Sequence, residues 1–148
     1  MKDITTLCYI KKENKYLFLL RGENKSDAGK WSGVGGHFYE GESPRECIIR
    51  EAKEETGYDI EPVFRGIVTF VNGDYTEYMF IFTSENFTGE EIACNEGRLE
   101  WIEEERILSL NTWQADKIFL KYIIENRPFF SLKAVYEGDT LLYAKEEE

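Results

Sequence analysis

The sequence is 148 residues long, carries a formal net charge of −11 at pH 7 and has an aromatic content of 15%. This length suits one domain over residues 1–148; without a membrane-spanning apolar run or a signal-peptide layout, we expect a cytoplasmic protein with no membrane partner. The negative charge disfavours a nucleic-acid polymer as partner, but not a small nucleotide bound together with a divalent cation.

The N-terminal part of the chain predicts two strands and an irregular segment. Residues 4–10 and 16–21 read as paired strands around the polar turn KKENK. A polar loop follows over residues 22–30. Residues 31–38, WSGVGGHF, have three glycines in four positions around Val34, which is typical of a strand edge or a tight loop.

The stretch ESPRECIIREAKEETG predicts the clearest helix of the chain. Ser43 suits the N-cap, Pro44 suits the first helical position, and Glu46 completes a capping box. Gly57 suits the residue just past the helix end. We therefore expect a helix between Ser43 and Gly57.

The rest of the chain predicts two hairpins, a strand and a second helix. One hairpin has strands at residues 63–71 and 75–84 and turns at Asn72-Gly73-Asp74. A loop over residues 85–97 leads to a short strand at 98–102 and a helix over 112–125. The C-terminal residues 130–144 read as a hairpin that turns at Glu137-Gly138-Asp139. Strands mixed with two helices indicate a layered α/β domain.

Three glutamates of the first helix raise an electrostatic problem. At 100° per residue, Glu51, Glu54 and Glu55 share a sector about 100° wide that borders the apolar face of the helix. Like charges at these spacings cost roughly 0.2–0.5 kcal/mol per pair, and acids in the last turn oppose the helix dipole. Arg50 and Lys53 lie elsewhere on the wheel and cannot neutralise all three. Either the face is simply solvated, or the carboxylates hold Mg²⁺ or Mn²⁺.

The residues around these glutamates follow the pattern G-x5-E-x7-R-E-U-x-E-E-x-G-U, where U is apolar. This pattern resembles the Nudix box, and Tyr58, in the last apolar position, is a mild departure from the aliphatic residue that the family more often has there. Every fixed position is matched, by Gly36, Glu42, Arg50, Glu51, Glu54, Glu55 and Gly57.

The resemblance implies a Nudix hydrolase, an α/β/α sandwich with a mixed sheet that uses a divalent metal to cleave a nucleoside diphosphate linked to another group. It implies that Glu51, Glu54, Glu55 and the carbonyl of Gly36 are metal ligands. It also implies that Arg50 orients a ligating glutamate and that Glu42 supports the loop–helix geometry. Metals held by carboxylates neutralise phosphate charge and activate water, and a nearby glutamate, for which we choose Glu51, accepts the water proton.

Beyond the box, the sequence is similar to the MutT branch and, within it, to oxidised-purine triphosphatases. The segment NEG resembles the place of an extra metal-binding or base glutamate, which makes Glu96 a candidate. Trp113 and Asp116 match a tryptophan that stacks on the base and an aspartate, three residues on, that reads its edge.

Other candidate substrate contacts depart from those enzymes or are weaker. Ser32 stands where some of those enzymes have an asparagine that touches the base, and Ser26 where they have an aromatic residue. Thr6 and Cys8 would line the same pocket if the first strand runs as in the family. His37 stands where relatives often have a lysine or another polar residue, so it is a candidate phosphate contact.

These features predict Mg²⁺-dependent hydrolysis of a nucleoside triphosphate to the monophosphate and pyrophosphate, serving nucleotide-pool sanitation and DNA repair, with 8-oxo-dGTP or a related modified purine as substrate. The box does not distinguish this reaction from hydrolysis of ADP-ribose, a dinucleotide polyphosphate or a capped RNA. A Nudix module that binds a nucleotide without cleaving it is the third reading. The expected partner is a small nucleotide, and the protein is expected to be a monomer or a homodimer.

Overall fold

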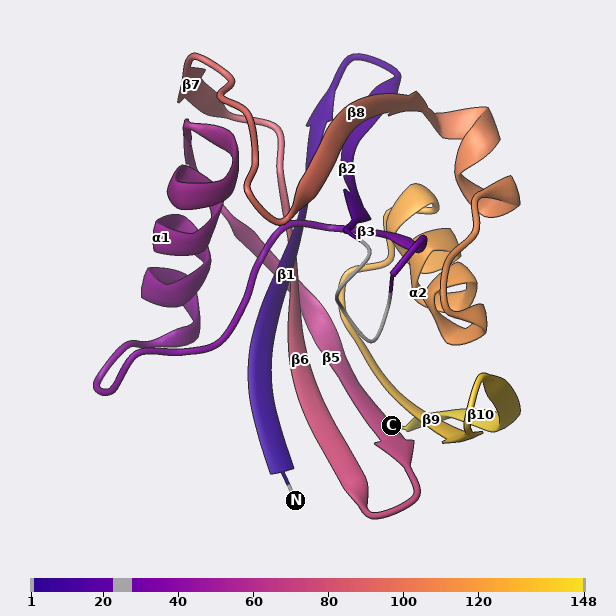
Figure 1. The fold of residues 1–148 in the computed structure, drawn as a ribbon. Coiled ribbons are helices and arrows are strands. Elements are labelled where there is room, and N and C mark those ends of the chain that lie inside the picture. The colour runs from indigo at the N-terminus through magenta and orange to yellow at the C-terminus, as the bar shows by residue number, and fades with distance from the viewer. Residues whose placement is uncertain (1, 23–27, 148) are drawn as a thin grey trace.

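The computed structural model, which describes residues 2–22 and 28–147, is built around one large mixed sheet (Figure 1). Its strands and helices are β1 (Lys2–Lys12), β2 (Lys15–Arg21), β3 (Trp31–Ser32), α1 (Pro44–Thr56), β4 (Tyr58–Ile60), β5 (Val63–Asn72), β6 (Tyr75–Ser84), β7 (Phe87–Gly89), β8 (Gly97–Glu103), the 3₁₀ helix η1 (Glu104–Ser109), α2 (Gln114–Ile124), β9 (Phe130–Glu137) and β10 (Thr140–Glu147). No helix within the described ranges is long and apolar enough to cross a bilayer.

The large sheet brings together strands from both ends of the chain. Its order is β10-β9-β5-β6-β1-β2-β3, with β8 also paired to β2. The pairs β1–β6 and β5–β9 are parallel, and the other neighbours in this sheet are antiparallel. β4 and β7 form a separate two-stranded sheet.

The two helices cover opposite faces of the large sheet (Figure 1). Side chains alternate between the faces along a strand, and β1 shows this alternation directly. Tyr9 packs in the core cluster that contains Phe119 of α2, whereas Cys8 and Ile10 pack in the cluster that contains Ile48 of α1. This arrangement confirms the predicted α/β/α sandwich.

The predicted capping box and helix end of α1 are confirmed. The Ser43 hydroxyl accepts the Glu46 N–H at 3.1 Å, and the Glu46 carboxylate accepts the Ser43 N–H at 2.9 Å. Gly57 ends the helix in the left-handed region, at φ 86°, and donates its N–H to the Lys53 carbonyl at 3.0 Å. Both hairpins also turn at the predicted residues.

The structure differs from the sequence-based expectations in three places. The predicted loop over residues 85–97 contains β7, which pairs with the equally unpredicted β4. The turns of η1 after β8 were not predicted, and α2 begins at Gln114, not Thr112, because Trp113 is its N-cap. For residues 31–38, where the sequence left a strand edge or a tight loop open, the structure has the strand edge: β3 is followed by isolated bridges that join Val34 to Cys8 and His37 to Thr5.

Candidate active site

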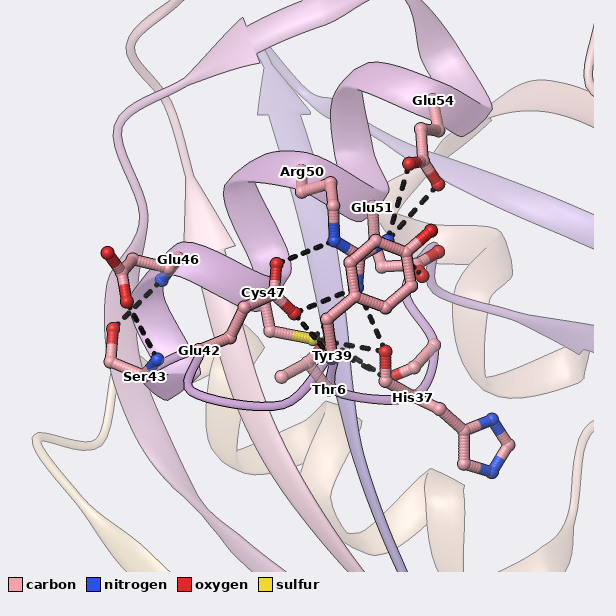
Figure 2. A network of polar contacts seen from close by, with 11 residues as sticks. Thr6, His37, Tyr39, Glu42, Ser43, Glu46, Cys47, Arg50, Glu51 and Glu54 are labelled. Atoms are coloured by element: carbon pink, nitrogen blue, oxygen red, sulfur yellow. Dashed lines mark hydrogen bonds and ion pairs between the residues drawn. The ribbon is translucent and has the colours of Figure 1, made fainter.

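Arg50 lies at the centre of the acidic site on α1 (Figure 2). Its Nε and Nη2 donate to the two oxygens of Glu42, at 2.6 and 3.0 Å, and Nη2 also donates to the carbonyl of His37 at 3.0 Å. Nη1 donates to Glu51 at 2.9 Å and to Glu54 at 3.2 Å. All five guanidinium N–H groups therefore meet an acceptor.

This network corrects the expectation that Arg50 lies away from the glutamates. The helical wheel treats Arg50 as a point on the opposite sector, but its long side chain reaches around the helix to both Glu51 and Glu54. The Glu42 contact is the main reason that the pKa of Arg50 is raised, and the Arg50 hydrogen bond holds the pKa of Glu42 below its usual range. One positive charge thus contacts two of the three helix glutamates as well as Glu42, and it offsets part of their mutual repulsion.

Tyr39 covers the outer side of this network. Its ring centroid lies 3.6 Å from Cζ of Arg50, a cation–π contact visible in Figure 2. The Tyr39 backbone N–H also donates to Glu42 at 2.7 Å, so the loop and the guanidinium share one carboxylate. The Arg50 side chain is consequently only 18% exposed although it lies at a surface cavity.

Glu55 differs from the other two glutamates because it is buried. The residue is 7% exposed, and its Oε1 accepts the Gly35 N–H at 2.7 Å. Burial, which disfavours the charged form, raises the pKa of Glu55 to about 7, against the lowering effect of the Gly35 hydrogen bond. Without a cation this carboxyl group is therefore partly protonated at neutral pH.

The predicted metal-site residues line one cavity of about 410 Å³. The cavity is lined by Gly35, Gly36, His37, Phe38, Tyr39, Glu51, Glu54, Glu55, Cys94, Asn95 and Glu96. Gly36 lies so close to Glu51 that an added Cβ would meet its carboxylate at 2.8 Å. The missing side chain at Gly36 thus leaves the space in which the Glu51 carboxylate lies.

The chemistry of these donors fits Mg²⁺ or Mn²⁺. The cavity offers carboxylate and carbonyl oxygens, which are hard ligands. Among the described residues, no three His, Cys, Asp or Glu side chains form a ready-made cluster. Glu51 and Glu54 accept hydrogen bonds from Arg50, and Glu55 accepts one from Gly35. Mg²⁺ is usually bound by one or two carboxylates plus waters and substrate phosphates, so the residues present suit it without such a cluster.

A second cavity, of about 630 Å³, lies on the α2 face of the sheet. It is lined by Leu7, Arg21, Ser32, Phe70, Asn72, Tyr75, Glu77, Met79, Trp113, Asp116, Gly138 and Asp139. The structure thus brings together three of the predicted substrate residues, Ser32, Trp113 and Asp116. Aromatic and apolar walls with a few charged groups are typical of a small-molecule site.

Neighbouring groups orient the residues of this second cavity. Trp113 packs against Phe70 and Tyr136, with ring centroids 5.3 and 5.2 Å away, and the Lys30 ammonium lies 4.7 Å from its ring centroid. Asp116, in the first turn of α2, is buried. The hydroxyl of Ser32 accepts a hydrogen bond from Nε of Arg21 at 3.1 Å.

The remaining candidates lie elsewhere. Thr6 and Cys8 are fully buried on the α1 side of β1, where the Thr6 hydroxyl lies 3.4 Å from the Cys47 sulfur. They do not line the second cavity, because strand alternation points Leu7 there instead. His37 lines the acidic cavity, with Nε2 3.5 Å from Asp3, and Ser26 lies outside the described residues.

Several cavity residues were not predicted, and some carried a usable signal. Side chains alternate between the two faces along β1, so an assignment of Tyr9 to the α2 face would have identified Leu7 as a residue of the second cavity. Tyr39 occupies a variable position of the box. Gly138 and Asp139 lie about 80 residues beyond the end of the box in the sequence, so their placement depends on pairing between distant strands.

Comparisons with known proteins agree with this geometry. Residues 1–123 match the family model described as the NUDIX domain. The chain is 33% identical over 129 residues to the uncharacterized Nudix hydrolase YvcI of Bacillus subtilis (strain 168), covering 82% of this chain and 79% of that protein. It is 27% identical to an oxidized purine nucleoside triphosphate hydrolase of Danio rerio, with 82% and 80% covered. The crystal structure of a mutator MutT protein from Bacillus halodurans has a TM-score of 0.90 at 27% identity, covering 98% of this chain and 97% of that one. The chain therefore belongs to the Nudix family and is a MutT-like Nudix hydrolase.

Proposed function

We propose that this protein hydrolyses a nucleoside triphosphate to the monophosphate and pyrophosphate with Mg²⁺, and that its substrate is 8-oxo-dGTP or a related modified purine nucleotide. The observation that carries the proposal is the pair of neighbouring cavities, one acidic and one aromatic. Ser32 lines the aromatic cavity and Gly35 the acidic one, three residues further on. Three residues span at most roughly 10 Å, so one nucleotide can place its base in one cavity and its phosphates in the other.

In the acidic cavity, Glu51, Glu54, Glu55, Glu96 and the Gly36 carbonyl would hold Mg²⁺. The bound metal supplies charge neutralisation on the phosphate oxygens and lowers the pKa of a water molecule. Glu51 accepts a proton from the attacking water, as a carboxylate within reach of the reacting atoms can.

Three further residues of the loop and helix support this arrangement. Arg50 orients Glu51 and Glu54 through Nη1, and Glu42 fixes the guanidinium through its two oxygens. His37, on the rim of the same cavity, contacts a phosphate.

In the aromatic cavity, Trp113 stacks on the base and Asp116 accepts hydrogen bonds from its edge. Ser32 lies close enough to the same cavity to contact the base or the sugar. The names of relatives from Danio rerio and Mus musculus, both oxidized purine nucleoside triphosphate hydrolases, support this choice of substrate. A cytoplasmic location, a single domain over residues 1–148 and a monomeric or homodimeric state stay predictions from the sequence.

A nucleotide panel tests the proposal. Purified protein is incubated with Mg²⁺ and 8-oxo-dGTP, dGTP, dATP, dCTP, ADP-ribose or a dinucleotide polyphosphate, and the products are separated by chromatography. We expect pyrophosphate and a monophosphate from purine triphosphates, and loss of this activity in Glu54→Gln. Turnover of ADP-ribose to two monophosphates without pyrophosphate would assign a different substrate, and nucleotide binding without any product would refute catalysis.

A further inference from the structure

The C-terminal hairpin forms part of the aromatic cavity although it lies beyond the matched residues 1–123. β9 pairs in parallel with β5, and the two lie side by side in Figure 1. Gly138 and Asp139, at the tip between β9 and β10, line the same cavity as Trp113 and Asp116. The hairpin is therefore a wall of this cavity as well as an edge of the sheet.

Asn72 fixes the hairpin tip to the end of β5. Its Nδ2 donates to the Gly138 carbonyl at 2.9 Å, and its Oδ1 accepts the Gly138 N–H at 3.1 Å. The last β5–β9 pair joins Asn72 to Tyr136, so this side-chain amide extends the strand ladder to the tip. Asn72 also lines the cavity itself, so its two hydrogen bonds to Gly138 lie at the wall of the cavity.

The other side of the hairpin braces the start of α2. The Leu141 N–H donates to Oε1 of Gln114 at 3.2 Å, and the Tyr136 hydroxyl accepts the Ala115 N–H at 2.8 Å. Gln114 and Ala115 lie between Trp113 and Asp116 in the chain. A displacement of the hairpin would therefore move both predicted base contacts together.

The tip also changes the charge of the cavity. Asp139 adds a carboxylate to a lining that contains Asp116 and Glu77, with Arg21 as the lining cation. Ionised carboxylates only accept hydrogen bonds, so they favour a base edge that presents N–H groups. They also repel a triphosphate chain, which directs the phosphates of a bound nucleotide away from the hairpin and toward the acidic cavity, where Glu51, Glu54 and Glu55 would hold a divalent cation that offsets the phosphate charge.

We propose that the hairpin tip is a specificity-determining wall of the base site, in which Asn72 positions the tip and Asp139 accepts a hydrogen bond from an amino or ring N–H group of a purine. This inference rests on the proposed function, since it names residues that select the base of the same substrate. It predicts that changes at the tip affect nucleotide affinity and base selection but not the chemical step.

The test uses Asn72→Ala, Asp139→Asn and the control Asn14→Ala. Asn14 also links a hairpin turn to another element, through a 3.0 Å hydrogen bond to Glu105, but lines neither cavity. Steady-state rates with dGTP, 8-oxo-dGTP and dTTP at saturating Mg²⁺ give kcat and KM. We expect Asn72→Ala to raise KM for the purine nucleotides about tenfold, as for the loss of about 1.4 kcal/mol of binding, and to leave kcat within about twofold.

For Asp139→Asn, which keeps the shape of an exposed turn residue, we expect the preference in kcat/KM for dGTP over dTTP to fall at least about fivefold. Unchanged KM and selectivity in both folded variants would overturn the inference, and so would a fall in kcat at constant KM. Binding of dGMP, measured by calorimetry, tests the hairpin inference separately from the proposed function. If the wild type turns over no triphosphate, the proposed function fails, while weaker dGMP binding by the variants would still support the hairpin wall.

Discussion

At the scale of single residues, Arg50 shows how a charge can organise a site without reacting. Arg50→Lys keeps the charge but loses the planar fork that holds Glu42, Glu51 and Glu54 together. We expect the free energy of unfolding to fall by about 1–3 kcal/mol, as measured by urea denaturation. We also expect the Mg²⁺ concentration for half-maximal activity to rise about tenfold, because the glutamates lose their fixed orientation.

Arg45→Lys is the matched control for this change, because Arg45 lies on the same helix and, among the residues that the structure describes, its guanidinium donates to the Pro62 carbonyl at 3.2 Å and to no carboxylate. Equal effects of the two substitutions on the Mg²⁺ concentration for half-maximal activity would contradict the positioning role of Arg50.

The ring of Tyr39 has a smaller and separable effect on the same guanidinium. A cation–π contact at an exposed site contributes roughly 0.5–1 kcal/mol, and Tyr39 is 60% exposed. We therefore expect Tyr39→Ala to raise the half-saturating Mg²⁺ concentration about two- to fivefold, whereas Tyr39→Phe, which retains the ring, stays close to the wild type. A Phe variant as impaired as the Ala variant would assign the effect to the hydroxyl and refute the stacking role.

The sequence identified the residue types of the site better than their contacts. Spacing alone placed Glu51, Glu54 and Glu55 on one side of α1, and this holds in the structure. It did not separate the buried Glu55 from the half-exposed Glu54, nor predict that Arg50 reaches around the helix. Both depend on the loop over residues 35–42, whose path is set by bridges to β1 and not by local propensity.

At the scale of elements, the end of α1 depends on one glycine. Gly57 has φ 86°, and a Cβ there would lie 2.3 Å from the Glu90 carbonyl. Gly57→Ala must therefore bear both the left-handed backbone and a collision, and we expect a loss of unfolding free energy of at least about 2 kcal/mol. Gly73→Ala provides the control, since Gly73 has φ 61° with nothing within 4 Å of its added Cβ. Thermal and urea unfolding of both variants separate the cost of the collision from the cost of the left-handed backbone. Equal losses of unfolding free energy in the two variants would show that the collision has no cost.

The elements that the sequence predicted well are those with local signals. The capping box of α1 and the glycine turns of both hairpins act within a few residues, and they appear where expected. The three-residue strands β4 and β7 are too short to show an alternating pattern, and their pairing joins residues about 30 positions apart. α2 begins later than predicted, at Gln114, for a similar reason. Its N-cap Trp113 packs against Phe70 and Tyr136, which come from distant strands.

At the scale of the whole molecule, the sheet order decides which residues share a cavity. The aromatic cavity draws its lining from β1, β2, β3, β5, β6, α2 and the C-terminal hairpin. A resemblance can transfer Trp113 and Asp116 as a short motif, but it cannot supply Glu77 or Asp139, whose positions depend on the β1–β6 and β5–β9 registers. The alternation of side chains along β1 explains why Thr6 faces α1 and Leu7 faces the cavity.

The acidic cavity also links metal binding to the stability of the whole fold, through Glu55. Burial raises the pKa of Glu55 to about 7, above the value near 4.5 of the unfolded chain, so between these values the folded state binds more protons. Without metal, the free energy of unfolding therefore falls as pH rises from about 4.5 through 7, by on the order of 2 kcal/mol. Glu55→Gln removes this slope, and saturating Mg²⁺ restores stability at pH 8 in the wild type by binding the ionised carboxylate. Urea denaturation at several pH values with EDTA or Mg²⁺ measures both, and an identical pH slope in Glu55→Gln would show that another group is responsible.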